Sequence, residues 1–284
     1  MEQKKKINPL VIILIVAFLL VGITVLVVRF VLGYNYTTLG NGGKFVGEYE
    51  NGQPIKGTIN YADGISGELD LLNRTITYSN GDLYEGDIKN GLRDGNGKLT
   101  RSATGDVYVG QFKDDEISGK GTFTYSNGDV YEGELLNSQK HGQGKFTYAN
   151  GNVYEGQFAN DVRSGKGRFT WASGTHYEGD FAEDLKNGYG VMVFENGDRY
   201  EGYFKNDMRE GENCIYIWND GERYNGAFIA NLMDTRKRDG DGNFILDANG
   251  EYTHGEMGIY TFSTGRTYRG YFMEGKAIGV SIEG

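Results

Sequence analysis

Five glutamates recur in this sequence, each at the centre of a Tyr-Glu-Gly tripeptide, and they are the first groups to consider for chemistry. They are Glu85, Glu132, Glu155, Glu178 and Glu201. A regular row of carboxylates could gather cations, but the solvated face of a β-sheet presents the same pattern. We interpret the row as a polar sheet face.

Asp239, Asp241 and Asn243 resemble the first half of a calcium-binding loop. The calcium pattern requires Gly at its sixth position and Glu at its twelfth, where this chain has Phe244 and Gly250. We therefore expect no metal site.

The histidines and glycine motifs give little support for catalysis. His141, His176 and His254 stand at different places in the pattern described below, without a partner nucleophile or metal-ligand spacing. The chain has no Gly-x-Ser-x-Gly elbow and no phosphate-binding loop, and its Gly-x-Gly pairs are never continued as Gly-x-Gly-x-x-Gly. The sequence predicts a protein that is not an enzyme and uses no cofactor.

Aromatic side chains form a third recurring set, and their chemistry is contact. If part of the set stayed exposed it would line a shallow groove suited to an extended peptide, a partner protein or a second copy of the chain. The alternative is that all the rings only hold the structure together. The predicted groove residues are Phe123, Tyr125, Tyr131, Phe146, Tyr148, Tyr154, Phe169, Trp171, Tyr177, Phe194 and Tyr200.

These residues are positioned by a repeat. The Tyr-Glu-Gly tripeptide ends at Gly133, Gly156, Gly179 and Gly202, in steps of 23 residues. A fixed period of this length is the signature of a repeat array. Weaker copies extend the array over residues 44–275, followed by a C-terminal end at 276–284.

Each repeat reads as a β-hairpin. Asn127-Gly128 and Asn150-Gly151 lie between runs rich in Phe, Tyr, Thr and Val, which is a strong hairpin signal. For the rings of both strands to share a face, the hairpin tip must hold an odd number of residues, three or five. We expect Gly133 to leave room for a ring of the neighbouring hairpin, and Gly142 and Gly144 to lie in the return loop. A single hairpin is marginal, so the units must stack.

The pattern Tyr-Glu-Gly-x-Phe, then Gly-x-Gly-x-Phe or Tyr, then Asn-Gly resembles the MORN repeat (membrane occupation and recognition nexus). It departs at Tyr108-Val109-Gly110, at Tyr224-Asn225-Gly226 and at Gly211-Glu212-Asn213. The resemblance covers some 230 residues and implies a binding array without catalysis. The predicted fold is all-β: antiparallel hairpins of about 23 residues stacked into an elongated twisted sheet or rod, preceded by one transmembrane α-helix.

The helix is predicted from the N-terminal segment. Leu10 to Val28 holds 19 residues without a charge, enough to span a hydrocarbon core of about 30 Å. We expect a basic cytoplasmic start at 1–9, a transmembrane helix at 10–32 and a tether at 33–43. Lys4, Lys5 and Lys6 precede the helix, so the positive-inside rule places the repeats outside the cytoplasm. A cleaved signal peptide is the alternative.

The formal net charge is −10, and removing the basic start makes the remainder more acidic. This charge argues against nucleic acid and against a broad anionic-lipid surface as partners. The single cysteine, Cys214, cannot form an internal disulfide, and we expect a buried thiol.

The sequence therefore predicts a single-pass membrane protein that acts as a non-enzymatic scaffold or adaptor. It would bind a protein partner, or itself, through the aromatic groove of its repeats. A strand near residues 270–280 could pair with another chain. The alternatives are a module that binds cell-envelope glycan through its rings and, less favoured because of the charge, an array that binds phospholipid.

Overall fold

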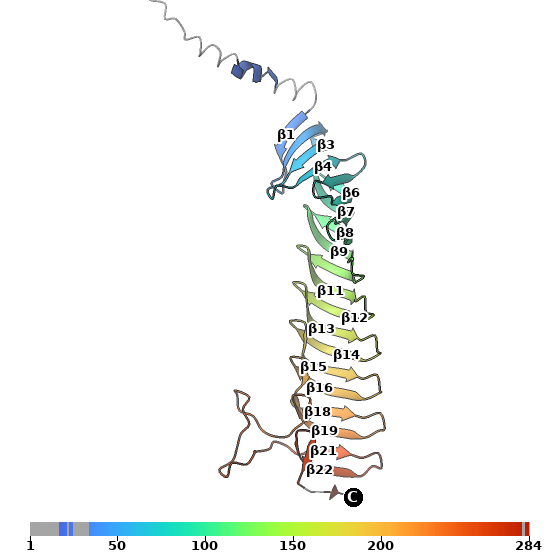
Figure 1. The fold of residues 1–284 in the computed structure, drawn as a ribbon, viewed down its shortest axis with the longest axis vertical. Coiled ribbons are helices and arrows are strands. Elements are labelled where there is room, and N and C mark those ends of the chain that lie inside the picture. Colours follow the sequence, from blue (N-terminus) through green and yellow to red (C-terminus); the bar gives the residue numbers. More distant parts are fainter. Residues whose placement is uncertain (1–16, 22, 25–33, 280–281, 284) are drawn as a thin grey trace, which may run out of the picture. The chain divides into compact units, whose positions relative to one another are not determined.

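The computed structural model describes residues 17–21, 23–24, 34–279 and 282–283, and it divides into two compact units, residues 1–126 and 127–284 (Figure 1). The described residues are almost entirely β-strand, and every strand pairing is antiparallel. This confirms the all-β hairpin fold expected from the repeat.

The first unit is a meander in which each strand pairs with the next along the chain. Its strands are β1 (Tyr34–Thr38), β2 (Lys44–Glu50), β3 (Gln53–Asn60), β4 (Ser66–Asp70), β5 (Thr75–Tyr78), β6 (Leu83–Lys89), β7 (Leu92–Thr100), β8 (Val107–Lys113) and β9 (Glu116–Thr124).

The strands of the second unit also pair antiparallel, and they lie side by side in Figure 1. Its strands are β10 (Val130–Leu136), β11 (Gln139–Thr147), β12 (Val153–Ala159), β13 (Val162–Thr170), β14 (His176–Ala182), β15 (Leu185–Val193), β16 (Arg199–Lys205), β17 (Met208–Arg209), β18 (Gly211–Ile217), β19 (Arg223–Ile229), β20 (Leu232–Met233), β21 (Gly258–Thr261), β22 (Thr267–Met273), β23 (Lys276–Ile278) and β24 (Ile282–Glu283).

The hairpin tips confirm the odd residue count. Thr147 pairs with Val153, which leaves five residues between the strands. The N–H of Tyr148 donates to the carbonyl of Asn152 (2.9 Å), so three residues remain at the tip, and the last of them, Gly151, has a φ of +87°. The aromatic sets of the two strands consequently face the same side.

The return turns differ from the prediction. Gly142 and Gly144 lie inside β11, not in a loop. The turn itself is the two-residue pair Asn137 and Ser138, both with positive φ, as a type I′ turn requires. Gly142, with a φ of +60°, lies where the ladder between β10 and β11 shifts register by two residues, so this glycine belongs to a strand irregularity.

A tyrosine from each regular repeat forms the core by covering a pair of cross-strand glycines. A Cβ on Gly133 or Gly144 would come within 2.5 Å of the Tyr131 side chain. The ring that fills the space above Gly133 therefore belongs to its own strand, not to the neighbouring hairpin as we expected. The Tyr131 hydroxyl then donates to the carbonyl of Glu134 at 2.7 Å.

Phenylalanines link these tyrosines into one continuous core in the second unit. Tyr177 makes edge-to-face contacts with Phe181 of its own strand (5.2 Å between centroids) and with Phe204 two strands on (4.9 Å). Tyr154 and Tyr200 repeat this arrangement. The edge-to-face series explains why a hairpin that is marginal alone is stable in the stack.

One repeat-length segment, residues 234–257, leaves the second unit's sheet, and β19 pairs directly with β21 across the gap (Figure 1). Isolated bridges such as Arg238 to Phe244 hold this excursion together. At its root, Asp234 and Arg236 form a buried ion pair of 2.6 Å, and the Arg236 guanidinium lies 3.9 Å from the Phe244 centroid.

Of the predicted transmembrane segment 10–32, the structure describes only residues 17–21 and 23–24, which are helical. Within the described ranges, no helix has the length and hydrophobicity needed to cross a membrane. The rest of that segment lies outside the described residues, so the anchor stays a prediction.

Candidate functional site

Five aromatic residues of the second unit occupy the same position in five successive hairpins, as the first residue of the loop. We call them the aromatic row: Tyr148, Trp171, Phe194, Trp218 and Phe262. In each, the backbone N–H donates to the carbonyl four residues on, at 2.8 to 2.9 Å. Four of the five are partly exposed and Phe262 is 42% exposed. The strand pairings place all five at one end of the hairpins, on the core-tyrosine face.

Four of the five loops are hydrogen-bonded to the repeat before them, which holds their rings in place. The N–H of Ala149 donates to Asp129 Oδ1 (2.7 Å), and the N–H of Ala172 donates to Asn152 Oδ1 (2.9 Å). These bonds act directly after Tyr148 and Trp171. The ring positions are therefore set by neighbouring repeats as well as by their own hairpin.

A second series of rings lies beneath the row, at the base of the spaces between neighbouring members of the row. Tyr148 lies 5.9 Å from Phe169 of the next hairpin, and Phe169 lies 4.6 Å from Trp171. Trp218 likewise lies 5.2 Å from Tyr260. The result is a series of shallow notches with a ring on either side. A ring also lies at the base of each notch except the one between Trp171 and Phe194, where Met192 takes this position.

Cations beside the row are committed to carboxylates of the following turn. Lys186 Nζ lies 5.5 Å from the Trp171 ring and 2.8 Å from Asp207 Oδ1, and its backbone N–H also donates to Asp207. Arg163 contacts Asp184 in the same way (2.9 Å). Burial alone would raise the pKa of Asp207, but the hydrogen bonds from Lys186 outweigh it and hold that pKa below its ordinary value.

These ion pairs expose their acids more than their bases. The Lys186 and Arg163 side chains are 14% and 19% exposed, whereas Asp207 and Asp184 are 44% and 48% exposed. A cavity of about 210 Å³ beside Trp171 is lined by these four residues, Phe169 and Phe181. The solvent side of the notch therefore presents carboxylates.

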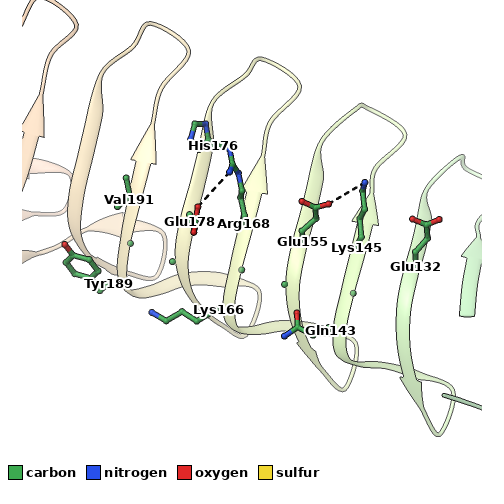
Figure 2. A pocket seen from close by; sticks show the side chains of 15 residues that line it. Glu132, Gln143, Lys145, Glu155, Lys166, Arg168, His176, Glu178, Tyr189 and Val191 are labelled. Carbon is green, nitrogen blue, oxygen red and sulfur yellow. Dashed lines mark ion pairs between the residues drawn. The ribbon is translucent and has the colours of Figure 1, made fainter. Parts of the chain in front are cut away.

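The opposite face of the same sheet holds a larger trough of about 1100 Å³ (Figure 2). Three of the five predicted glutamates, Glu132, Glu155 and Glu178, line it. Two of these pair across strands, Glu155 with Lys145 (3.5 Å) and Glu178 with Arg168 (3.9 Å), whereas Glu85 pairs with Lys98 and Glu201 with Arg199 elsewhere. His176 lies beside Glu178 and Arg168, and Gln143, Lys166 and Tyr189 line the other side of the trough. The four paired side chains in the trough are 45 to 70% exposed, so the trough is a solvated ladder of charge pairs.

The predicted groove residues fall into two groups, and the first corrects the prediction. Tyr131, Tyr154, Tyr177 and Tyr200 are 0% exposed, and Phe123 and Phe169 are 7% and 8% exposed. Because these rings cover glycines or contact other rings, they are part of the core, and Phe169 also lies at the base of a notch in the row. The second group is partly exposed: Tyr125, Phe146, Tyr148, Trp171 and Phe194.

Sequence reasoning missed Trp218 and Phe262. The signal was present, because each precedes a three-residue tip ending in glycine, Asn219-Asp220-Gly221 and Ser263-Thr264-Gly265, as Tyr148 precedes Ala149-Asn150-Gly151. The loop position, not the tripeptide, identifies the row.

The remaining candidates for chemistry are dispersed. Cys214 is buried opposite Gly226, where other repeats have a glycine, and its Sγ accepts the Tyr200 hydroxyl at 3.1 Å. His254 Nδ1 lies 2.9 Å from Thr235 Oγ1 at the root of the excursion. Across the described part of the chain, no three or more His, Cys, Asp or Glu side chains form a group that could hold a metal ion.

Comparison with known proteins agrees with the repeat. The MORN repeat model matches residues 84–103, 108–130, 131–153, 154–176, 177–199 and 200–223. No curated protein matches the chain. Among solved structures, the TCP10 domain of Danio rerio CPAP in complex with a peptide of Danio rerio STIL is similar, with 14% identity, a TM-score of 0.41, and coverage of 87% of this chain and 98% of that chain. Another structure of the wild-type TCP10 domain has 9% identity, a TM-score of 0.35 and coverage of 88% and 99%. Residues 84–223 of this chain are therefore six MORN repeats.

Proposed function

We propose that this protein is a non-enzymatic binding module that holds another protein against the aromatic row, and that residues 10–32 tether it to a membrane. The observation that carries the proposal is the exposure of five rings at one loop position, while four core tyrosines of the same hairpins are 0% exposed: Tyr154, Tyr177, Tyr200 and Tyr224. Aromatic side chains dominate interface energetics. Rings that are already held by their neighbours lose little further freedom on binding.

The trough supports a binding role less well. Its charged side chains pair with each other across strands, and exposed ion pairs of this kind contribute little energy to either folding or association. A ligand would have to displace them or bind over them. The rings of the aromatic row are uncharged, so a ligand that contacts them has no ion pair of the rings to displace.

Partner capture by the full chain tests the role of the row. We expect the double variant Trp171→Ala, Trp218→Ala to lose the proteins that crosslink to the wild-type chain in cells. The matched control is Tyr189→Ala, Tyr203→Ala, because these exposed rings lie on the trough face. Capture lost only in the control would assign binding to the trough instead. Retained protein capture with lost sedimentation on envelope polysaccharide would favour the glycan alternative.

The tether has its own test. The full chain should sediment with membranes and resist extraction by high salt, whereas a chain starting at residue 34 should not. External protease should reach the repeats in intact cells, because the basic residues before the apolar segment favour an outward orientation. A full chain released by salt alone would remove the tether from the proposal.

A further inference from the structure

The aromatic row has a fixed spacing that can be compared with the repeats of extended ligands. Successive members are two strands apart, and strands in a sheet are about 4.8 Å apart, so the rings recur about every 9.6 Å. A polyproline II helix has three residues per turn and a rise of about 3.1 Å, which gives about 9.3 Å per turn. Over the four intervals of the row the difference accumulates to only about 1 Å.

Other backbone conformations fit this spacing less well. Two turns of an α-helix span about 10.8 Å, so a helix would fall out of step by about 5 Å along the row. Same-face side chains of a β-strand recur about every 6.8 Å. The row therefore matches one turn of polyproline II per repeat.

The notches suit proline in shape and chemistry. Each is bounded by rings, as between Tyr148 and Trp171 over Phe169. Proline is flat and apolar, has no N–H to satisfy, and is already fixed in φ, so it loses little freedom on binding. Rings that accept proline in this way need no deep pocket.

Charge along the row specifies the rest of the ligand. Asp161, Asp184 and Asp207 expose 44 to 48% of their side chains beside the rings, while their cationic partners are 14 to 19% exposed. These carboxylates recur once per repeat over three repeats, and Asn231 takes the same position in the next one. A ligand with one basic residue per turn would place each cation near a carboxylate.

We propose that the aromatic row binds a proline-rich segment in the polyproline II conformation that carries basic residues among its prolines. This inference rests on the proposed function, since it names the class of partner segment for the same surface. It predicts that binding depends on the turn spacing of the ligand and not on its charge alone.

The test uses a labelled peptide, (Pro-Pro-Lys)4, titrated into the full chain with fluorescence anisotropy. Its 12 residues make about four turns, the length of the row. A flexible peptide of equal charge, (Gly-Ser-Lys)4, should bind at least about tenfold more weakly. Inserting Gly-Gly between two (Pro-Pro-Lys)2 halves should weaken binding severalfold, because the second half loses its phase. Equal affinity for all three peptides, or no saturable binding of the first, would overturn the inference.

Variants place the peptide on the molecule. Trp171→Ala should weaken binding at least about tenfold, Phe262→Ala less, and Tyr203→Ala on the trough face not at all. Asp184→Asn with Asp207→Asn should weaken binding and reduce its salt dependence. Near-ultraviolet circular dichroism checks that each variant is folded. If Trp171→Ala does not fold, Phe262→Ala, which removes the most exposed ring of the row, is the variant to use. Loss on Tyr203→Ala alone would contradict the assignment.

The two proposals can fail separately. If (Pro-Pro-Lys)4 does not bind, but the double variant of the row still loses captured protein, then the row is an interface for a different kind of segment. If neither peptide binding nor protein capture depends on the row, both proposals are wrong.

Discussion

The middle of each hairpin and its loop end use the same type of residue for different purposes. Tyr177, at the middle, is 0% exposed, lies over Gly179 and Gly190, and donates its hydroxyl to the carbonyl of Asp180 at 2.9 Å. Trp171, at the loop end on the same face, is partly exposed. The glycine pair accounts for the difference. The Tyr177 ring packs directly on the backbone of Gly179 and Gly190, whereas Trp171 has no glycine pair beneath it and stays near the surface.

The largest effect should come from removing a core ring. Tyr177→Ala should lower the free energy of unfolding by about 3 to 5 kcal/mol, because it opens a cavity between Phe181 and Phe204. Urea denaturation followed by circular dichroism measures this. A loss below about 1 kcal/mol would mean that the middle of the hairpin is not the core.

The glycine beneath that ring should be nearly as sensitive. A Cβ on Gly190 would meet the Tyr177 ring at 2.4 Å, so Gly190→Ala should cost about 2 to 3 kcal/mol. Gly174 is the matched control, since a Cβ there meets nothing within 4 Å and only its φ of +98° is strained. Gly174→Ala should cost about 1 kcal/mol, and equal losses for the two variants would contradict the glycine argument.

Trp171→Ala should change stability by only about 1 kcal/mol, since the ring is partly solvated in the native state. The same variant should reduce partner binding, which Tyr177→Ala cannot do without unfolding its repeat. Thermal melting beside the binding assay separates the two effects. A large shift in the melting temperature would place Trp171 in the core.

The smallest effect should be the pH dependence of the ion pairs beside the row. The folded-state pKa of Asp207 is below its ordinary value of 3.8, so the charged form is favoured by folding. Its contribution is therefore present above about pH 4 and is lost as pH falls through the lowered pKa. Because the carboxylate is 44% exposed, we expect less than about 1 kcal/mol. Asp207→Asn should reduce stability at pH 7 and flatten the acid limb between pH 4 and 2.

The sequence predicted the repeat, the hairpins, the odd tip and the shared aromatic face, because period and alternation follow directly from strand geometry. It did not separate buried rings from exposed ones. Tyr131 and Tyr148 have the same residue type and lie on the same face, and the glycine pair beneath the Tyr131 ring distinguishes them. Gly144 lies in a strand and not in the expected loop, because a glycine beneath a ring and a glycine in a turn look identical in sequence.

The excursion at 234–257 could not be foreseen in detail. Its sequence retains Arg238, Gly240, Gly242 and Phe244 at repeat-like spacing, yet this segment leaves the sheet. The buried pair of Asp234 and Arg236 fixes its root, and such a pair depends on contacts that are distant in sequence, as between Arg236 and Glu274.

The bond between each turn carboxylate and the preceding repeat gives the stack a direction. Asp184 accepts the backbone N–H of Arg163, and Asp207 accepts the backbone N–H of Lys186. In both pairs the acid belongs to the repeat that follows its base. Trimming the chain from its C-terminal side leaves the last remaining base without its acid, whereas trimming from the other side leaves an acid without its base. Removing the same number of repeats from the two ends therefore leaves different groups at the cut. Removal from the C-terminal side exposes an unpaired cation that lies above aromatic rings.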